Sequence, residues 1–415
     1  MQTLTAFVIF LLAVVVTSAG AVDTCDRIIQ HGYPCGRHNL TTSDGYRLTM
    51  FRIPHSHRGD PQHNVTDKPP VLFMHCVECS SDIWILVGPD SALPFMLADA
   101  GFDVWLGNAR GNMYSEEHVT MERSSIAFWA FSLDELGTID VPAKIDYILA
   151  KSKKKSLHFV GYSQGTTNFI AALSNKPEYN DKIRSSHLLG PVVFLCHVGG
   201  PFPVLASPLV GSDNPFAHML GTLVGTVPLH ELTALARSVA LALCTRPDFE
   251  EMCVGIMNII AGWDSPYLNR SVIPELLSTF PAGCSFRQFV HYAQNVMSCD
   301  FRYFDFGLAG NMLKYGQAKP PSYNLSNVHP ETPMELYFAD NDNFVPARDI
   351  YHLYKIFGKR ASWNRVKHTK YNHNDYAMAY NVKECLYDCI LDKMQEYERR
   401  PFKGDQCTCF KKNAF

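Results

Sequence analysis

The sequence predicts an α/β fold, in which a mostly parallel sheet carries helices on both faces and is interrupted by one inserted segment. Short apolar strands alternate with helical patterns from Gly45 to about Phe194, and the alternation returns from Pro333. Between these two parts the alternation disappears, and the chain becomes rich in Pro, Gly, Met and aromatic residues. We therefore expect a core formed by residues 22–194 and 327–415, with a cap or lid at 195–326.

Apolar runs between turn residues define the expected strands, and apolar residues at helical spacing define the helices. The expected strands are Gly45–Met50, Pro70–Met74, Phe102–Leu106, Leu157–Val160, Ser186–Phe194, Met334–Phe338 and Arg365–His368. The expected helices are Ala92–Ala100, Asp140–Ala150, Thr166–Asn175 and Ala347–Phe357. Pro142 fits the first turn of its helix, where the missing N–H costs nothing. The uncharged stretch from Ser186 to Ser212 contains four prolines, so we expect a strand and an irregular loop there rather than a membrane span.

The sequence Gly161-Tyr162-Ser163-Gln164-Gly165 lies between an expected strand and an expected helix. Strand, G-x-S-x-G and helix together are the context of a nucleophile elbow, a sharp turn that holds a serine hydroxyl above the sheet. Glycines two residues to either side avoid collisions with the neighbouring backbone. The free N–H groups at the start of the helix favour negative charge beside the serine. We therefore expect Ser163 to be a catalytic nucleophile.

A serine nucleophile needs a histidine base that a carboxylate orients. In the α/β-hydrolase fold the chain order is Ser, then Asp or Glu, then His. Asp340 and Asp342 follow the strand Met334–Phe338, and His368 and His373 lie at and beyond the last expected strand. The residues alone leave both choices open.

Longer stretches resemble the acid lipase family, which includes gastric and lysosomal acid lipases and insect relatives. The similar stretches are Ile28-Ile29, His31–Pro34, Asp44–Tyr46, Arg52–Pro54, Leu97–Asn108, Arg110–Asn112, Phe128–Ser132, the elbow with Thr166 and Thr167, and Tyr371–His373. The resemblance implies the α/β-hydrolase fold and a triad of Ser163, Asp342 and His373. It also implies a disulfide between Cys244 and Cys253, and a lid over an acyl-chain pocket.

One loop departs from the family pattern. Where the family has His-Gly-Leu, this chain has His75-Cys76-Val77. The resemblance implies that the oxyanion hole is formed by the backbone N–H groups of Val77 and Gln164. A cysteine in place of glycine predicts backbone strain if the position requires a conformation that only glycine tolerates. Cys76 and Cys79 either form a disulfide or remain two free thiols.

The N-terminal residues predict a secreted protein. Ala6–Val16 is apolar, and Ala19-Gly20-Ala21 suits signal peptidase, so we expect a signal peptide at 1–21. The sequence also contains N-glycosylation sequons at Asn39, Asn64, Asn269 and Asn324. Extracellular space is the expected location, with the lysosome as the alternative, and we expect no transmembrane segment after cleavage.

Thirteen cysteines are an odd number, so at least one must be unpaired within a monomer. Cys385 and Cys389 share one helix face, where free thiols and a bond are both compatible with the spacing. A net charge of −3 and a charged fraction of 19% give no basis for nucleic-acid binding. No histidine pattern predicts a metal site, and a serine triad needs no cofactor.

Two functions remain. The first is a serine lipase or esterase that hydrolyses triacylglycerols or steryl esters at a lipid–water interface through an acyl-enzyme. The second is a lipid-binding protein with weak or absent turnover, to which the replacement of the family's glycine by Cys76 would point. The sequence gives no information on the oligomeric state.

Overall fold

The computed structural model describes residues 22–56, 68–225, 227, 230–330, 334–398 and 407–411. The expected signal peptide and the sequon at Asn64 lie outside the described residues. Among the described residues, no helix combines the length and the apolar character that crossing a membrane requires.

A nine-stranded, mostly parallel sheet forms the centre of the fold, with the strand order β1-β2-β4-β3-β6-β7-β8-β9 and β5 paired to β2. The strands are β1 (Gly36–Thr41), β2 (Tyr46–Ile53), β3 (Pro70–Met74), β4 (Asp103–Gly107), β5 (Glu117–His118), β6 (Leu157–Tyr162), β7 (Ile183–Leu189), β8 (Met334–Phe338) and β9 (Ala361–Arg365). Pairing is antiparallel between β1, β2, β4 and β5, and parallel from β4 through β9. This is the α/β-hydrolase fold that the sequence predicts.

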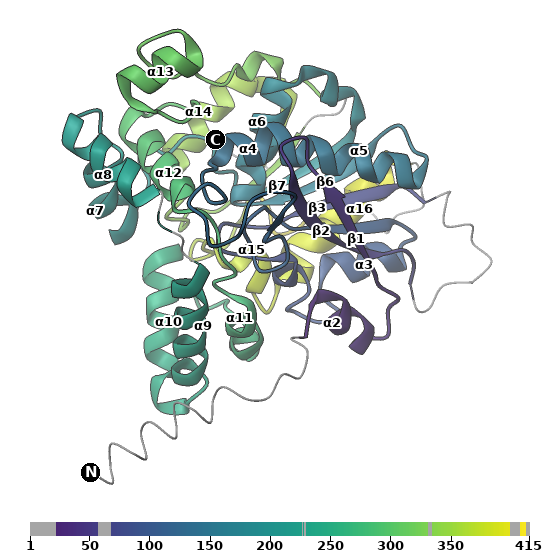
Figure 1. The fold of residues 1–415 in the computed structure, drawn as a ribbon. Helices are drawn as coiled ribbons and strands as arrows, with labels where there is room; N and C mark the ends of the chain where they lie inside the picture. The colour runs from purple at the N-terminus through teal and green to yellow at the C-terminus, as the bar shows by residue number, and fades with distance from the viewer. Residues whose placement is uncertain are drawn as a thin grey trace.

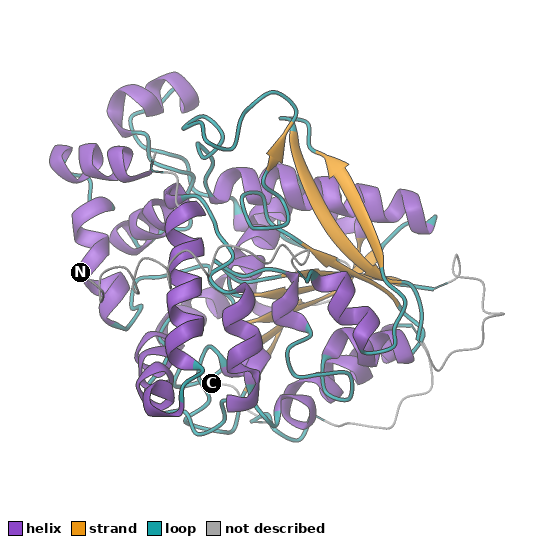
Figure 2. Ribbon diagram, turned by 60° about the horizontal axis from the view of Figure 1, so that its bottom comes forward, coloured by secondary structure: helices purple, strands orange, loops and turns teal. Residues whose placement is uncertain are grey.

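Helices cover both faces of the sheet (Figures 1 and 2). The core helices are α2 (Thr24–Gln30), α3 (Leu93–Asp99), α4 (Leu133–Glu135), α5 (Val141–Ser152), α6 (Gln164–Asn175), α14 (Ala347–Phe357), α15 (Asp375–Met378) and α16 (Asp388–Tyr397). Short 3₁₀ turns lie at Ser81–Trp84, Pro177–Lys182, Leu325–Asn327 and Gly358–Arg360, and π turns at Leu136–Asp140 and Lys383–Tyr387.

The alternation of side chains along each strand divides the core into two clusters. On β3, Val71 and Phe73 join one cluster with α3 and α16, whereas Leu72 and Met74 join the other with α5 and α6. All five residues of β3 are buried because helices cover both of its faces. A continuous apolar run is therefore the correct pattern for a central strand of this sheet.

Seven helices, α7–α13, lie at the left of Figure 1, and we call them the cap helices after the cap expected from the sequence. They are α7 (Pro201–Val210), α8 (Pro215–Gly225), α9 (His230–Cys244), α10 (Pro247–Ala261), α11 (Ile273–Thr279), α12 (Phe286–Ser298) and α13 (Gly307–Tyr315), with a 3₁₀ turn at Arg270–Val272. The irregular loop expected up to Ser212 is wrong, because Pro201–Val210 is helical. Its first prolines lie in the first turn, where they need no hydrogen-bond partner.

Two strand expectations also need correction. The strand expected at Ser186–Phe194 begins at Ile183 and ends at Leu189, because Gly190 turns the chain with a φ of +56°. The last strand is Ala361–Arg365 rather than Arg365–His368, and beyond it Val366 forms an isolated bridge to Phe410.

Twelve of the described cysteines form six disulfides, and Cys284 is the free cysteine of the described chain. The pairs are Cys25–Cys35, Cys76–Cys79, Cys196–Cys299, Cys244–Cys253, Cys385–Cys409 and Cys389–Cys407. The two cysteines that share a helix face are therefore bonded to the C-terminal segment and not to each other. The Cys244–Cys253 bond joins α9 to α10.

Candidate active site

Ser163 occupies the sharp turn between β6 and α6. Its backbone has φ of +53° and ψ of −115°, a conformation that a residue with a side chain rarely adopts. The N–H of Ser163 donates to the carbonyl of Leu189 at 2.9 Å, which continues the pairing of β6 with β7 into the turn. Holding a serine in such a conformation costs on the order of 1–3 kcal/mol and is typical of catalytic turns.

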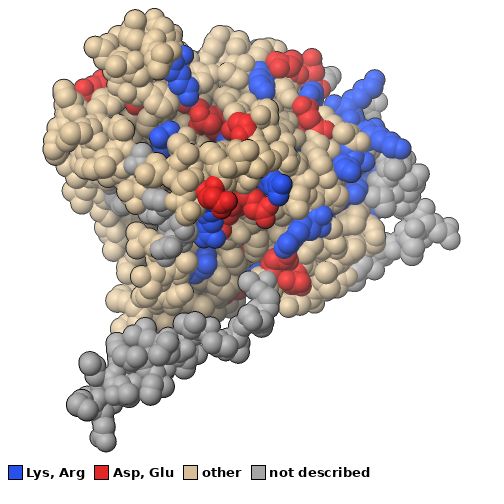
Figure 3. All heavy atoms as spheres, viewed as in Figure 1, with Lys and Arg blue, Asp and Glu red and all other residues tan. Residues whose placement is uncertain are grey.

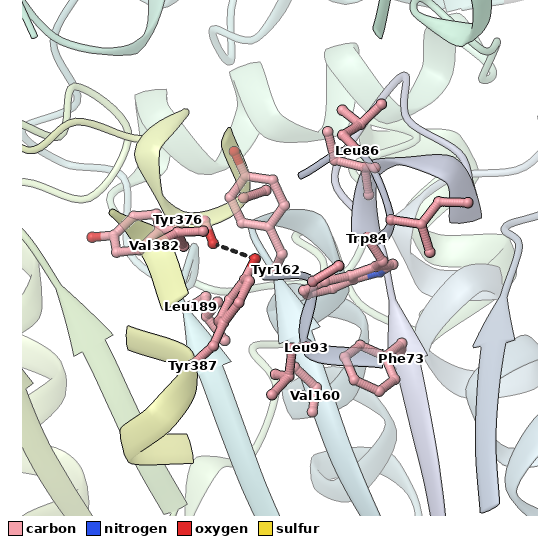
Figure 4. Close-up of a cluster of buried hydrophobic side chains, with 14 of the residues drawn as sticks. Phe73, Trp84, Leu86, Leu93, Val160, Tyr162, Leu189, Tyr376, Val382 and Tyr387 are labelled. Atoms are coloured by element: carbon pink, nitrogen blue, oxygen red, sulfur yellow. Dashed lines mark hydrogen bonds between the residues drawn. The ribbon is translucent and has the colours of Figure 1, made fainter. Parts of the chain in front are cut away.

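The glycines of the elbow are required by close contacts. A side-chain carbon at Gly165 would overlap the carbonyl oxygen of Met74, the last residue of β3. At Gly161 such a carbon would lie 2.9 Å from the Phe159 ring and 3.0 Å from the backbone of Gly165. Beneath the turn, aromatic residues fill the space around Tyr162 and fix the end of β6 (Figure 4). The motif is therefore set by packing on both sides of Ser163.

His373 and Asp342 form a buried hydrogen-bonded pair. The imidazole Nδ1 donates to Asp342 Oδ2 at 2.8 Å, and the other carboxylate oxygen accepts the N–H groups of Phe344 and Val345 at 2.8 and 3.0 Å. These two bonds leave Oδ2 aimed at the imidazole. With Nδ1 protonated in this way, Nε2 of the neutral ring is the basic nitrogen.

The His373 loop lies against the elbow. The Tyr162 hydroxyl donates to the His373 carbonyl at 2.8 Å, and the two rings are 5.3 Å apart between centroids. A side-chain carbon at Gly190 would lie 2.9 Å from the imidazole, so this glycine leaves room for the ring. Ser163, Asp342 and His373 are 7%, 4% and 5% exposed.

The structure thus brings three expected side chains to one edge of the sheet. Among the described residues, Ser163 Oγ makes no hydrogen bond with the imidazole, and such catalytic bonds are often long in a free enzyme. The competing residues have other partners. Asp340 pairs with Arg365 at 2.7 Å and with Lys411 at 3.2 Å, and His368 lies 3.2 Å from the Tyr267 hydroxyl.

Two backbone N–H groups are available beside Ser163. Neither Val77 N–H nor Gln164 N–H donates to any group in the described part of the chain. Gln164 is the first residue of α6, where N–H groups have no partner within the helix. Val77 follows β3, the strand that contacts the elbow through Met74. Unpaired donors at this place are what an oxyanion hole needs.

His75 orients the peptide that carries the Val77 N–H. Its Nε2 accepts the N–H of Ala109 at 3.0 Å, so Nδ1 carries the proton and donates to the Cys76 carbonyl at 2.7 Å. Burial lowers the pKa of His75 to about 4, which keeps the ring neutral in this role. In a trans peptide the C=O and the next N–H point in opposite directions, so fixing the Cys76 carbonyl also fixes the Val77 donor.

The strain expected at Cys76 is not found. Among the described residues the positive φ in this loop belongs to Glu78, at +57°, and not to Cys76. Cys76 is bonded to Cys79, and the N–H of Cys79 donates to the Cys76 carbonyl at 3.2 Å. The loop is therefore a turn closed by a disulfide.

Sequence reasoning missed two residues that hold this loop and the elbow. The Glu78 carboxylate accepts bonds from Gly283 and Cys284, and the Gln164 side chain donates to Gln288 Oε1 at 2.8 Å. Gln288 belongs to α12 and lies 124 residues after Gln164 in the sequence. Neither contact has a local sequence signal.

Three sequons can be located. Asn39 on β1 and Asn324 are exposed, and Asn269 is partly buried and accepts the N–H of Ser271 at 3.2 Å. Their glycosylation stays a prediction.

Two clusters of potential metal ligands lie in the described chain: His368 with Cys385 and Cys409, and Cys196 with His197 and Asp349. Each cysteine in them is disulfide-bonded. A disulfide sulfur is not a thiolate, which is the form that binds a metal ion. Neither cluster therefore offers a full ligand set.

Replacing Gly165 by alanine should disturb both the elbow and β3. The added carbon meets a rigid backbone carbonyl, so we expect a loss of about 1–3 kcal/mol in the free energy of unfolding. Urea denaturation measures it. Gly255→Ala on α10 is the matched control, because nothing surrounds that position and alanine should add roughly 0.5–1 kcal/mol. Equal stabilities of Gly165→Ala and the parent would contradict the contact.

The stability that two buried acids contribute should fall as the pH rises towards neutrality. Burial raises the pKa of Asp375 to about 7 from an unfolded value of 3.8, and it raises the pKa of Glu116 to about 7 from 4.5. Between about pH 4 and 7 these two groups keep protons in the folded chain that they have released in the unfolded chain, so their contribution to the free energy of unfolding decreases with pH. The lowered pKa of His75 acts in the opposite direction, so the test compares the parent with a variant. Urea unfolding across this range tests it. Asp375→Asn should make the slope of the free energy of unfolding against pH more positive than in the parent, and an unchanged slope would contradict the assignment.

Comparison with known proteins identifies the family of this chain. A family described as a partial alpha/beta-hydrolase lipase region matches residues 24–88, and the alpha/beta hydrolase fold family matches residues 69–241. Lipase 3 of Drosophila melanogaster is 36% identical over 93% of this chain and 96% of its own length. Human Lipase member K is 34% identical over 88% of this chain and 89% of its own. Bovine gastric triacylglycerol lipase is 33% identical over 91% of this chain and 92% of its own length. The chain therefore belongs to the acid lipase family of α/β-hydrolases.

Proposed function

We propose that this protein is a lipase that hydrolyses lipid carboxylic esters, such as triacylglycerols or steryl esters, through an acyl-enzyme on Ser163. The observation that carries the proposal is the 2.8 Å bond between His373 and Asp342, packed against the strained turn of Ser163. Nucleophile, base and orienting carboxylate follow each other in the chain order of this fold. The relatives named as lipases support the same reaction class.

His373 Nε2 takes the proton of the Ser163 hydroxyl as the oxygen attacks the ester carbonyl carbon. Asp342 holds the imidazole in place and stabilises its positive charge. The tetrahedral intermediate collapses, the C–O bond to the alcohol breaks, and His373 returns the proton to the departing alcohol. A water molecule then gives its proton to His373 and attacks the acyl carbon. The fatty acid and the free hydroxyl of Ser163 are the products of this second half.

The negative oxygen of each tetrahedral intermediate would bind the N–H groups of Val77 and Gln164. Their lack of other partners leaves both free to donate as the charge develops. His75 and the Cys76–Cys79 disulfide hold the first donor, and the start of α6 holds the second.

The second hypothesis, a lipid-binding protein with weak turnover, rested on strain at Cys76. Because Cys76 has no positive φ and is tied into a disulfide turn, this reason has no support from the backbone. The loop of this chain is better described as a different way of holding the same donor. We therefore retain the enzyme as the proposal.

We propose further that the protein works outside the cytosol, as a secreted enzyme or, alternatively, in the lysosome. Six disulfides need an oxidising route of synthesis.

Two cap helices offer a surface for lipid. Large apolar side chains on α7 and α8 are exposed, at Val204, Leu205, Leu209, Phe216, Met219 and Leu223. Charged side chains gather mainly over other parts of the face shown in Figure 3, and the surface over α7 and α8 at its left is mostly uncharged. Contiguous apolar surface of this kind marks an interaction site. We assign it to contact with the lipid–water interface.

Removing the triad should abolish hydrolysis. Ser163→Ala should lower kcat on a long-chain fluorogenic ester by about 10⁴-fold or more, because no nucleophile remains. Asp342→Asn should lower it by about 10⁴-fold, because the imidazole loses its orienting carboxylate. A serine-directed phosphonate should label the parent at Ser163.

The competing residues are the matched controls. Asp340→Asn and His368→Gln should keep kcat within a few-fold of the parent, since neither side chain contacts His373 or Ser163. Full activity in Ser163→Ala would refute the acyl-enzyme. Assays across ester chain lengths, at acidic and neutral pH, would then define the substrate and the pH optimum.

Substitutions on the α7–α8 surface should slow the hydrolysis of aggregated substrate only. Leu205→Ser, Phe216→Ser and Met219→Ser in one variant remove about 1.5–3 kcal/mol of burial each, so hydrolysis of an emulsified ester should fall by about 10-fold or more. Hydrolysis of a soluble short-chain ester should not change. Leu313→Ser on α13, another exposed apolar position, is the control. Equal loss on both substrates would contradict interfacial binding.

A further inference from the structure

Glu78 follows the Val77 donor directly and is bonded three times to one stretch of the cap region. Its backbone carbonyl accepts the N–H of Ala282 at 2.6 Å. Its carboxylate accepts the N–H of Gly283 at 3.0 Å and the thiol of Cys284 at 2.9 Å. This stretch comes just before α12. Glu78 is therefore a partly buried link between the core and the cap helices.

The protonation states of Glu78 and Cys284 suit a stable hydrogen bond between the two segments. Burial raises the pKa of the Cys284 thiol, and the Glu78 carboxylate raises it further, so the sulfur keeps its proton and remains a donor. Burial also raises the pKa of Glu78, while its two donors and the charge of Arg237 favour the carboxylate. Leaving a partly buried carboxylate without these donors would be costly, so the link holds both sides together.

The same part of the chain also contacts the second donor. The side chain of Gln164 donates to Gln288 in the first turn of α12. Residues 282–288 thus touch the loop of Val77 through Glu78 and the elbow through Gln288. The residue after Val77 and the side chain of Gln164 therefore both contact one short segment of the cap region.

We propose that Glu78 is a positioning residue, which fixes the Val77 N–H in the oxyanion hole by tying the loop 76–79 to residues 282–284. This inference rests on the proposed function and deepens it. His75 and the disulfide fix the loop from within the core. They leave the far side of the turn, with its positive φ at Glu78, dependent on the bonds to the cap region.

The prediction for Glu78→Ala concerns turnover. Loss of an oxyanion donor lowers turnover by about 10²–10³-fold, so a donor that is displaced but present should lower kcat by roughly 10- to 100-fold. KM should stay within about two-fold, because the donor acts on the transition state rather than on ester binding. Glu78→Gln should regain most of kcat, since its amide oxygen still accepts from Gly283 and its NH₂ reaches the sulfur. Steady-state kinetics on a soluble ester measure both.

Asp134→Asn is the matched control, because Asp134 is another carboxylate that links the core to the cap region, and it is buried. It accepts the N–H of Phe304 and the hydroxyl of Tyr323, far along the chain from the oxyanion loop. It should lower Tm while keeping kcat within a few-fold. Should Glu78→Ala not fold, Glu78→Asp takes its place: its shorter side chain cannot reach both donors, and kcat should fall about 3- to 10-fold.

Two results would overturn the inference. The first is a kcat of Glu78→Ala within two-fold of the parent, or of Glu78→Asp where that variant replaces it. The second is an equal loss of kcat in that variant and in Asp134→Asn. Failure of the proposed function is seen separately, as a parent that neither hydrolyses esters nor reacts with the phosphonate at Ser163. If the parent is active and the substitution of Glu78 leaves kcat unchanged, only this inference is rejected.

Discussion

The close approach of β3 to the elbow is the contact on which the rest of the site depends. Gly165 allows the start of α6 to touch the carbonyl of Met74, and no other residue fits there. The chain continues from Met74 into the loop of Val77, while Ser163 and Gln164 precede Gly165. One backbone contact therefore sets the nucleophile and both candidate oxyanion donors relative to each other.

The core was largely predictable because its elements are locally marked. Pro70–Met74, Met334–Phe338 and Ala347–Phe357 have the predicted bounds, since a buried strand between breakers and an amphipathic helix leave clear patterns. Ser186–Phe194 was too long, because hydropathy does not reveal that Gly190 turns the chain. The helix at Pro201–Val210 was missed because its prolines suggested a loop.

The candidate catalytic residue types could be predicted from the sequence, but the residues that hold them in place could not. The residues alone could not choose between Asp340 and Asp342, because both follow the same strand, and the choice came from resemblance. In the structure Asp342 contacts His373, whereas Asp340 pairs with Arg365. The pairing of Cys385 and Cys389 with the C-terminal segment, like the roles of Glu78 and Gln288, depends on contacts between distant segments. No local pattern encodes them, and the bounds of the cap remain a prediction.

α12 contacts both the cap helices α7 and α8 and the elbow of the core. α12 packs against α7 and α8, with Gly221 of α8 so close that a side-chain carbon there would lie 3.2 Å from Val290 of α12. The first turn of α12 contributes Gln288, which holds the residue after Ser163. Packed elements without free volume move together rather than deform separately. If a lipid surface shifted α7 and α8, the movement would therefore also act on α12, and through Gln288 on Gln164, a candidate oxyanion donor.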